Sequence, residues 1–117
     1  MTPPPKGSKA AGRRLWASVL AGFELDEHEM VLLRQAVRVA DTCEDLQVVV
    51  DTEGHVVGVG ERARTHPAVV ELRQQRIVLA RLIVALRVPL GEDEQPKQGA
   101  PRLQRRPLRG VYGGAAS

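Results

Sequence analysis

The chain has one cysteine and very few aromatic residues, and each shortage excludes a class of protein. Cys43 stands alone among 117 residues, so neither an internal disulfide framework nor a zinc site of several cysteines can form. It is most simply a small apolar side chain in a reducing compartment. Aromatic residues make up 3% of the chain, as Trp16, Phe23 and Tyr112. Because the other apolar residues are mainly Leu, Val, Ile and Ala, helix-on-helix packing is favoured over a β-sandwich.

Long apolar runs and catalytic motifs are also missing. No stretch approaches 18 consecutive apolar residues, and the first residues lack the apolar centre of a signal peptide, so we expect a cytoplasmic protein without a membrane span. No phosphate-binding Gly-x-x-x-x-Gly-Lys-Ser/Thr loop, Gly-x-Ser-x-Gly elbow or His-Glu-x-x-His motif is present. His28, His55 and His66 are scattered along the chain. We therefore expect no metal, no cofactor and no enzymatic activity.

Two acidic clusters could be read as the paired carboxylates of a metal-dependent nuclease. One comprises Asp26, Glu27 and Glu29, and the other is Glu44-Asp45. Helix capping and solvated helix surface explain both clusters better, because each falls at the start or on the polar side of a predicted helix.

Positive charge is concentrated at the two ends of the chain. Residues 1–14 carry a charge of +4 and residues 95–117 a charge of +5, both without an acid, while residues 15–94 carry −6. Basic segments of this kind often contact nucleic acid or an acidic protein face. The alternative is that they are simply solvated.

Three helices are predicted from apolar spacing and from helix start and stop residues. The first spans about 9–22, with Ser8 as N-cap and Gly22 as C-cap, and Gly12 weakens its start by about 1 kcal/mol relative to alanine. The second begins at a capping box formed by Asp26 and Glu29 and ends near 50–53, before Gly54.

The third helix begins at Pro67, which suits the first turn, and ends before Pro89. His66 is expected at its N-cap or in the approach to it, and Thr65 is a second residue able to cap the helix. Between the second and third helices, Gly54 and the run His55-Val-Val-Gly-Val indicate a Gly-containing loop or a short β-hairpin. Valines 48–50 fit either the end of the second helix or a strand of that hairpin, and we favour the helix.

The predicted fold is therefore mainly α, with a short N-terminal helix and an antiparallel pair of long helices. Its domain organisation is a flexible N-terminal arm over 1–8, a helical domain over 9–90 and a flexible basic tail over 91–117. The tail is rich in Pro and Gly and poor in aliphatic residues, so it cannot offset the entropy of ordering.

Residues 60–90 resemble part of a known family. A Gly-rich turn, the helix start His66-Pro67, a helix rich in Leu and Arg and the ending Leu86-x-x-Pro89 look like the small subunit of tailed-bacteriophage terminases. The resemblance extends over about 12–90. It implies a non-enzymatic subunit in the host cytoplasm that forms a ring of several protomers and binds viral double-stranded DNA at the packaging-initiation site. It also implies delivery of that DNA to the large subunit, which holds the ATPase and nuclease.

Three groups of residues are candidates for these contacts. Assembly is also expected from the broad apolar faces of the second and third helices, since about 80 ordered residues bury only part of their surface. The candidate DNA-binding residues are Lys6, Lys9, Arg13, Arg14, Arg62 and Arg64. The candidate subunit-interface residues are Leu33, Val37, Leu72, Leu79, Ile83 and Leu86. The candidate partner-binding residues of the tail are Arg102, Arg105, Arg106 and Arg109.

Two other functions remain open on the sequence. One is a small dimeric DNA-binding transcriptional regulator that reads DNA with its first two helices. The other is a protein-binding phage adaptor that uses the helix pair to dock a partner. Oligomer number distinguishes the regulator from the ring, and salt-dependent DNA retention distinguishes the adaptor from both.

Overall fold

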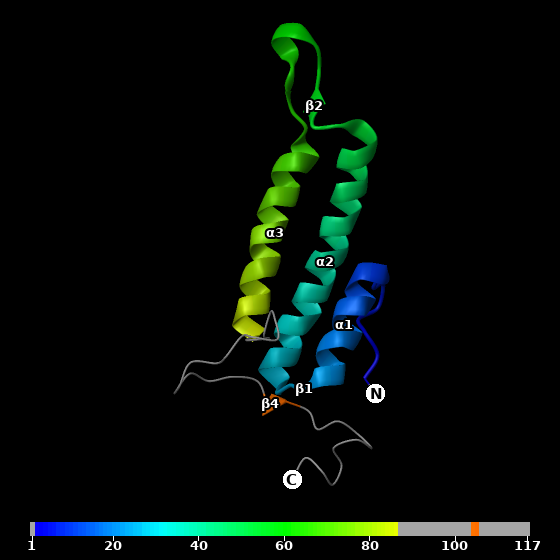
Figure 1. The fold of residues 1–117 in the computed structure, drawn as a ribbon, viewed down its shortest axis with the longest axis vertical. Helices are drawn as coiled ribbons and strands as arrows, with labels where there is room; N and C mark the ends of the chain where they lie inside the picture. Colours follow the sequence, from blue (N-terminus) through cyan, green and yellow to red (C-terminus); the bar gives the residue numbers. More distant parts are fainter. Residues whose placement is uncertain (1, 87–103, 106–117) are drawn as a thin grey trace.

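The structure is a computed structural model that describes residues 2–86 and 104–105. Figure 1 shows two long helices side by side and a shorter helix that lies next to the lower half of one of them. This arrangement confirms the mainly α fold predicted from the sequence. Along the chain the elements are α1 (Ala10–Gly22), β1 (Phe23–Glu24), α2 (Glu27–Glu53), β2 (Val56–Val57), a 3₁₀ helix (Gly60–Arg62), β3 (Arg64–Thr65), α3 (Pro67–Leu86) and β4 (Gln104–Arg105).

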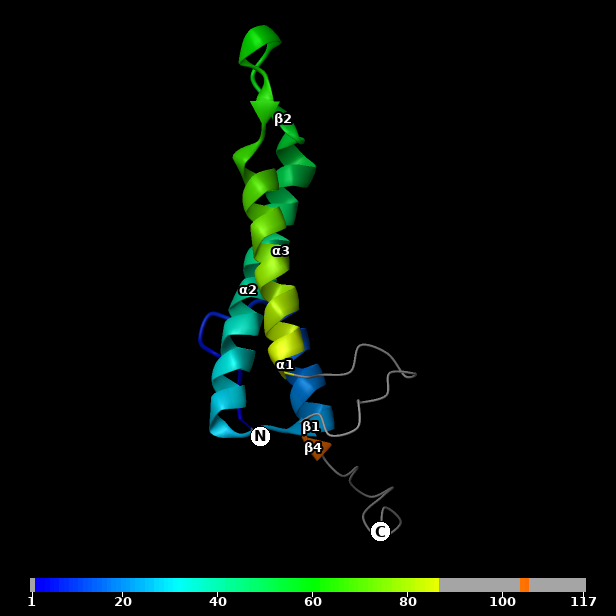
Figure 2. The same ribbon diagram turned by 90° about the vertical axis from the view of Figure 1, so that its left-hand side faces the viewer.

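A short hairpin joins α2 to α3 and extends beyond the ends of both helices (Figure 2). β2 and β3 pair antiparallel, with Val56 opposite Thr65 and Val57 opposite Arg64. Gly58 has a φ of 83°, and a Cβ atom there would lie 2.5 Å from the Arg62 carbonyl oxygen, so this turn requires glycine. The hairpin alternative is therefore the one observed, and valines 48–50 belong to α2 as favoured from the sequence.

α2 begins and ends where its sequence predicts. Asp26 and Glu29 form the capping box, in which the Asp26 N–H donates to Glu29 Oε1 at 2.7 Å. Gly54 ends the helix with a φ of 86°, a conformation that glycine adopts without strain. Each end of α2 is therefore set by residues that lie next to it in the sequence.

α1 is capped by a residue of another helix, which corrects the expected Ser8 cap. Lys9 occupies the N-cap position and makes no side-chain cap hydrogen bond. Instead, the buried Asp41 of α2 accepts from the Lys9 N–H at 2.8 Å and from the Gly12 N–H at 2.7 Å. The Ser8 hydroxyl donates to the Pro5 carbonyl oxygen at 2.6 Å. At the other end Phe23, rather than Gly22, is the C-cap.

The N-terminal arm lies against the helices over its described part. The Trp16 indole Nε1–H donates to the Thr2 carbonyl oxygen at 3.0 Å, and Pro4 and Pro5 are half-buried. These contacts place residues 2–8 against the start of α1 and the neighbouring part of the helix pair. A run of prolines loses little entropy on ordering, which makes this packing inexpensive.

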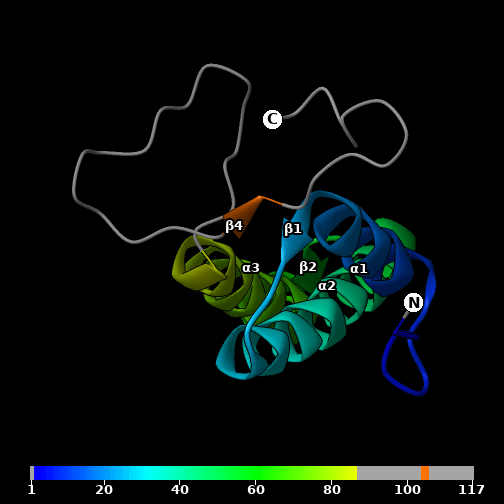
Figure 3. The ribbon, with the colours of Figure 1, turned by 90° about the horizontal axis from the view of Figure 1, so that it is seen from below.

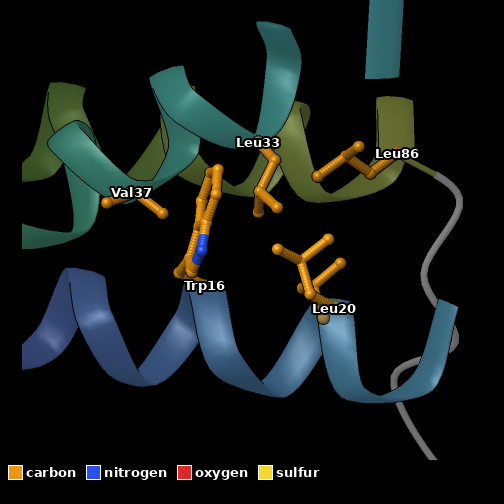
Figure 4. Close-up of a cluster of buried hydrophobic side chains, with 6 residues drawn as sticks. Trp16, Leu20, Leu33, Val37 and Leu86 are labelled. Atoms are coloured by element: carbon orange, nitrogen blue, oxygen red, sulfur yellow. The ribbon is translucent and has the colours of Figure 1, made fainter. Parts of the chain in front are cut away.

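Two apolar clusters hold the helices together. The first contains Trp16, Val19 and Leu20 of α1, Leu33 and Val37 of α2, and Leu86 of α3. Figure 4 shows the Trp16 ring rising from α1 towards Val37 and Leu33. The second cluster, around Val50, Ala68 and Leu72, joins only α2 and α3. α1 therefore supports the half of the helix pair near β1, and the half near the hairpin has two layers of helix only.

α3 starts at His66, which was expected from the sequence as its N-cap, and the structure adds that this histidine is buried. The Ala68 N–H donates to His66 Nδ1 at 2.9 Å, so Nδ1 carries no hydrogen and the hydrogen sits on Nε2. Nε2 lies 2.8 Å from Glu53 Oε1 at the end of α2. The His66 backbone N–H donates to the His55 carbonyl oxygen at 2.8 Å. One side chain thus caps α3 and links it to the end of α2.

Replacing His66 with alanine should lower the free energy of unfolding by about 1–2 kcal/mol, the usual effect of losing an N-cap side chain. His66→Asn should recover most of that loss, because asparagine is among the best N-cap residues. Urea unfolding followed by circular dichroism measures both changes. An alanine variant as stable as the wild type would show that the Nδ1 contact contributes nothing.

The remaining sequence-based expectations for the C-terminal part fall mostly outside the described residues, including the stop at Pro89 and most of the tail over 91–117. Within the tail, Gln104 and Arg105 pair antiparallel with Glu24 and Phe23 of β1. Among the described residues, no helix is both long and apolar enough to cross a membrane.

Candidate functional site

The basic residues predicted to bind DNA form two separate groups. Lys6, Lys9, Arg13 and Arg14 surround the start of α1, whereas Arg62 and Arg64 lie in the hairpin, and all six are exposed. In Figure 1, α1 starts about halfway along α2 and the hairpin lies beyond the far end of α2. The structure therefore does not bring the two groups together into one patch within a single chain.

Lys9 is engaged by an acid of the same chain. Its Nζ lies 2.7 Å from Asp45 Oδ2, and both side chains are exposed. The hydrogen bond to Asp45 and the negative charge of that carboxylate raise the pKa of Lys9, which keeps the ammonium group charged. A phosphate would have to compete with Asp45 for this lysine.

The start of α1 is not a free anion site, although helix N-termini commonly bind phosphates. The Asp41 carboxylate already accepts from the Lys9 and Gly12 N–H groups, and Asp41 is buried. Any phosphate contact in this region must therefore come from side chains that point outward. Arg13 Nη1 donates to the Ser8 carbonyl oxygen, which leaves its other guanidinium donors available.

Five of the six cations have no acid partner among residues 2–86. Lys9 pairs with Asp45, whereas no ion pair is made there by Lys6, Arg13, Arg14, Arg62 or Arg64. At the hairpin tip, Val59 has 85% of its surface exposed and precedes the 3₁₀ helix that carries Arg62. Unpaired guanidinium groups on a projecting hairpin can contact phosphates without first breaking an internal ion pair.

Four of the six candidate interface residues belong to the core of a single chain. Leu33, Val37, Leu72 and Leu86 are buried, and they lie in the two apolar clusters. They are thus corrected from interface to core residues. Leu79 and Ile83 are half-buried.

Part of the apolar surface that the described chain exposes lies elsewhere on α3. Val70, Ile77 and Val84 are exposed to 45%, 43% and 68%. Their seven-residue spacing was the signal that could have identified them in the sequence, because it places them on one side of a helix. Sequence reasoning instead assigned the interface to the larger aliphatic residues, which pack inside the protomer.

The tail candidates can be placed only in part. Arg105 lies in β4, opposite Phe23. Arg102, Arg106 and Arg109 lie outside the described residues. The structure therefore gives no geometry for a partner site in the tail.

One group of possible metal ligands exists among the described residues. Ligand atoms of Asp26, His28 and Glu29 lie within 4.8 Å of one another. Asp26 and Glu29 form the capping box of α2, which accounts for their proximity. The cluster is therefore explained by the start of the helix.

Cys43 has no feature of a reactive thiol. Burial raises the pKa of Cys43, and the nearby positive charge of Arg76 only partly opposes this effect. A raised pKa lowers the fraction of thiolate, the form that acts as nucleophile. Its contact with the second cluster fits the structural role expected from the sequence.

Comparison of the chain with protein-family models, with curated proteins and with solved structures finds no match.

Proposed function

We propose that the protein is a non-catalytic DNA-binding subunit of the terminase small-subunit kind, which assembles as a ring-like homo-oligomer on viral double-stranded DNA. In this role it recruits and regulates a separate large subunit with ATPase and nuclease activity. The observation that carries the proposal is the pair of exposed cationic groups, one at the start of α1 and one on the hairpin. Arg14, Arg62 and Arg64 have no internal acid partner among the described residues.

Two separate cationic groups suit a multisubunit DNA-binding assembly. Each protomer offers only a few phosphate contacts, and such contacts give weak binding at physiological salt when they act alone. Several protomers in one assembly multiply these contacts on a single DNA molecule. The exposed apolar residues of α3 provide surface for that assembly.

The proposal is tested by measuring binding of fluorescent double-stranded DNA across a salt series. Each phosphate contact contributes about 0.9 to the slope of log affinity against log salt concentration. Replacing both Arg13 and Arg14 with glutamine should therefore reduce the slope by about 2 per protomer bound. The Arg62→Gln and Arg64→Gln double variant should act in the same direction.

A matched control removes equal charge elsewhere. Arg34 and Arg38 lie on α2, outside both cationic groups and away from α3; Arg34 is half-buried and Arg38 is exposed. Their double replacement by glutamine should leave the salt slope unchanged. Wild-type protein without salt-dependent DNA binding would reject the proposal in favour of a protein-binding adaptor. A DNA-binding dimer would favour a transcriptional regulator instead.

A further inference from the structure

α3 carries a row of exposed residues on the side turned away from its buried positions. Val70, Arg73, Ile77, Ala80 and Val84, here called the α3 stripe, follow one another at alternating intervals of three and four residues and are all exposed. Buried Ala68, Leu72 and Leu86 face the rest of the protein. Alternating intervals of three and four are those of a seam along which one helix packs against another. No described element covers this seam.

A second uncovered row lies on α2. Leu33, Val37 and Asp41 follow one another along α2 at four-residue intervals and face α1. Asp41 marks the end of this contact, because it binds the first turn of α1. Continuing in the same direction along the helix, the row presents Glu44, Val48 and Asp51, here called the α2 strip, and all three are exposed. Figure 1 shows that α1 does not extend along this half of α2. The row that α1 covers at one end is therefore open at the other.

The helix segments that bear the two rows carry opposite charge. α3 contains Arg73, Arg76 and Arg81 against a single acid, Glu71. Residues 41–53 of α2 contain five acids and no basic residue. Two copies of α3 packed on each other would bring arginines together, whereas α3 packed on the α2 strip brings arginine to glutamate and aspartate. Such complementarity selects the partner surface and disfavours the like-charged one.

We propose that the α3 stripe of one copy docks onto the α2 strip of a second copy. This inference rests on the homo-oligomer part of the proposed function and names its interface. Viewed along the helices, α3 and α1 lie on different sides of α2 (Figure 3), so the two surfaces face different directions. Contact between two different surfaces leaves one of each unused in every pair, so further copies can add, and a rotation that closes on itself gives a ring.

A groove beside the α3 stripe enlarges the surface that docking would cover. It has a volume of about 510 Å³ and lies between the hairpin-proximal halves of α2 and α3. Val50 and Leu72 provide apolar lining, and Arg76 donates to the Gln47 side chain at its edge. The groove shares Arg73, Ile77 and Ala80 with the stripe. A copy seated on the stripe would therefore also exclude water from the groove.

Introducing a charge into the stripe tests the docking surface. Val84 is 68% exposed and lies outside the groove, so the Val84→Glu variant should fold normally. Its dissociation constant for self-association should be at least ten-fold higher than that of the wild type. Val31→Glu is the matched control, because Val31 is 47% exposed on α2 but belongs to neither row. Sedimentation velocity of the full chain over a concentration series measures both. A monomeric wild type at micromolar concentration, or equal weakening by both variants, would overturn the inference.

Charge reversal tests which surface faces the stripe. Arg73→Glu alone, and Glu44→Arg with Asp51→Arg, should each weaken assembly ten-fold or more. All three changes in one chain should restore assembly to within a few-fold of wild type. If α3 instead packed on α3, the acidic stripes would still repel each other, and the combined variant would remain dissociated. Lack of restoration therefore rejects the α2 strip as the partner surface.

The same variants separate this inference from DNA binding. None of Val84, Glu44 or Asp51 belongs to the two cationic groups. A ring-forming wild type without DNA affinity would retain the interface and reject the proposed function. A monomer that binds DNA with a steep salt dependence would reject the interface and the ring, and it would leave the DNA-binding part of the proposed function in place.

Discussion

Replacing Gly12 with alanine is expected to destabilise the protein by about 1–3 kcal/mol, the usual effect of forcing extra atoms into a packed site. A Cβ atom at Gly12 would lie 2.5 Å from Asp41 Oδ2, 2.7 Å from Val37 Cγ1 and 2.9 Å from the Val37 carbonyl oxygen. Helix propensity acts in the opposite direction, because alanine in a helix interior is favoured over glycine by about 1 kcal/mol. The clash dominates because one of its contacts is backbone, which cannot move without shifting α2.

Gly22→Ala is the matched control in the same helix. No atom lies within 4 Å of the position that a Cβ would take at Gly22. Only the propensity effect remains, so this change should leave stability unchanged or raise it by up to about 1 kcal/mol. Urea unfolding monitored by the fluorescence of Trp16, the single tryptophan, compares the two variants directly. Changes of the same sign in both variants would contradict the close packing of α1 on α2.

The boundaries of the long helices could be predicted because they depend on neighbouring residues. Asp26 and Glu29 are three positions apart, and Gly54 and Pro67 act through their own backbone preferences. His66 also caps within two residues, through the Ala68 N–H. In each case the physical cause lies within one helical turn, and the sequence shows it directly.

The start of α1 could not be predicted in the same way. Its cap, Asp41, is 32 residues from Lys9 and 29 from Gly12, and it becomes a neighbour only after α1 has packed on α2. From the sequence, Ser8 was the obvious cap and Gly12 only a weakness in the helix. In the structure Gly12 is the residue that allows the Asp41 carboxylate to approach the backbone.

The candidate interface residues show a second limit of sequence reasoning. Apolar periodicity places Leu33 in an apolar row of α2, and Leu72 and Val84 in two different rows of α3, but it does not show which rows are covered. Leu33 and Leu72 are covered by helices of the same chain, whereas Val84 is not. The helix packing decides this outcome, because Leu33 and Leu72 lie in the two apolar clusters and no described element packs on the outer row of α3.

Replacing Asp41 with alanine is expected to have the largest effect of any single change considered, a loss of about 2–4 kcal/mol in the free energy of unfolding. A hydrogen bond to a charged group contributes about 1.5–3 kcal/mol, and the buried Asp41 carboxylate makes two such bonds. Alanine would leave the Gly12 N–H without a partner in a buried position. Loss of the negative charge also removes a favourable interaction with the positive end of the α1 dipole.

Two comparison variants identify the cause of that loss. Asp41→Asn keeps one acceptor oxygen, so it can satisfy one of the two N–H groups, and its stability should lie between those of wild type and the alanine variant. Asp45→Ala removes an exposed acid that lies on the same helix and pairs with the Lys9 side chain, and its effect should be much smaller. Urea unfolding ranks the variants, and amide hydrogen exchange at Lys9 and Gly12 reports directly on the cap. Equal stability of Asp41→Ala and Asp45→Ala would show that the cap does not hold α1 to α2, and the fixed placement of Arg13 and Arg14 would then need another cause.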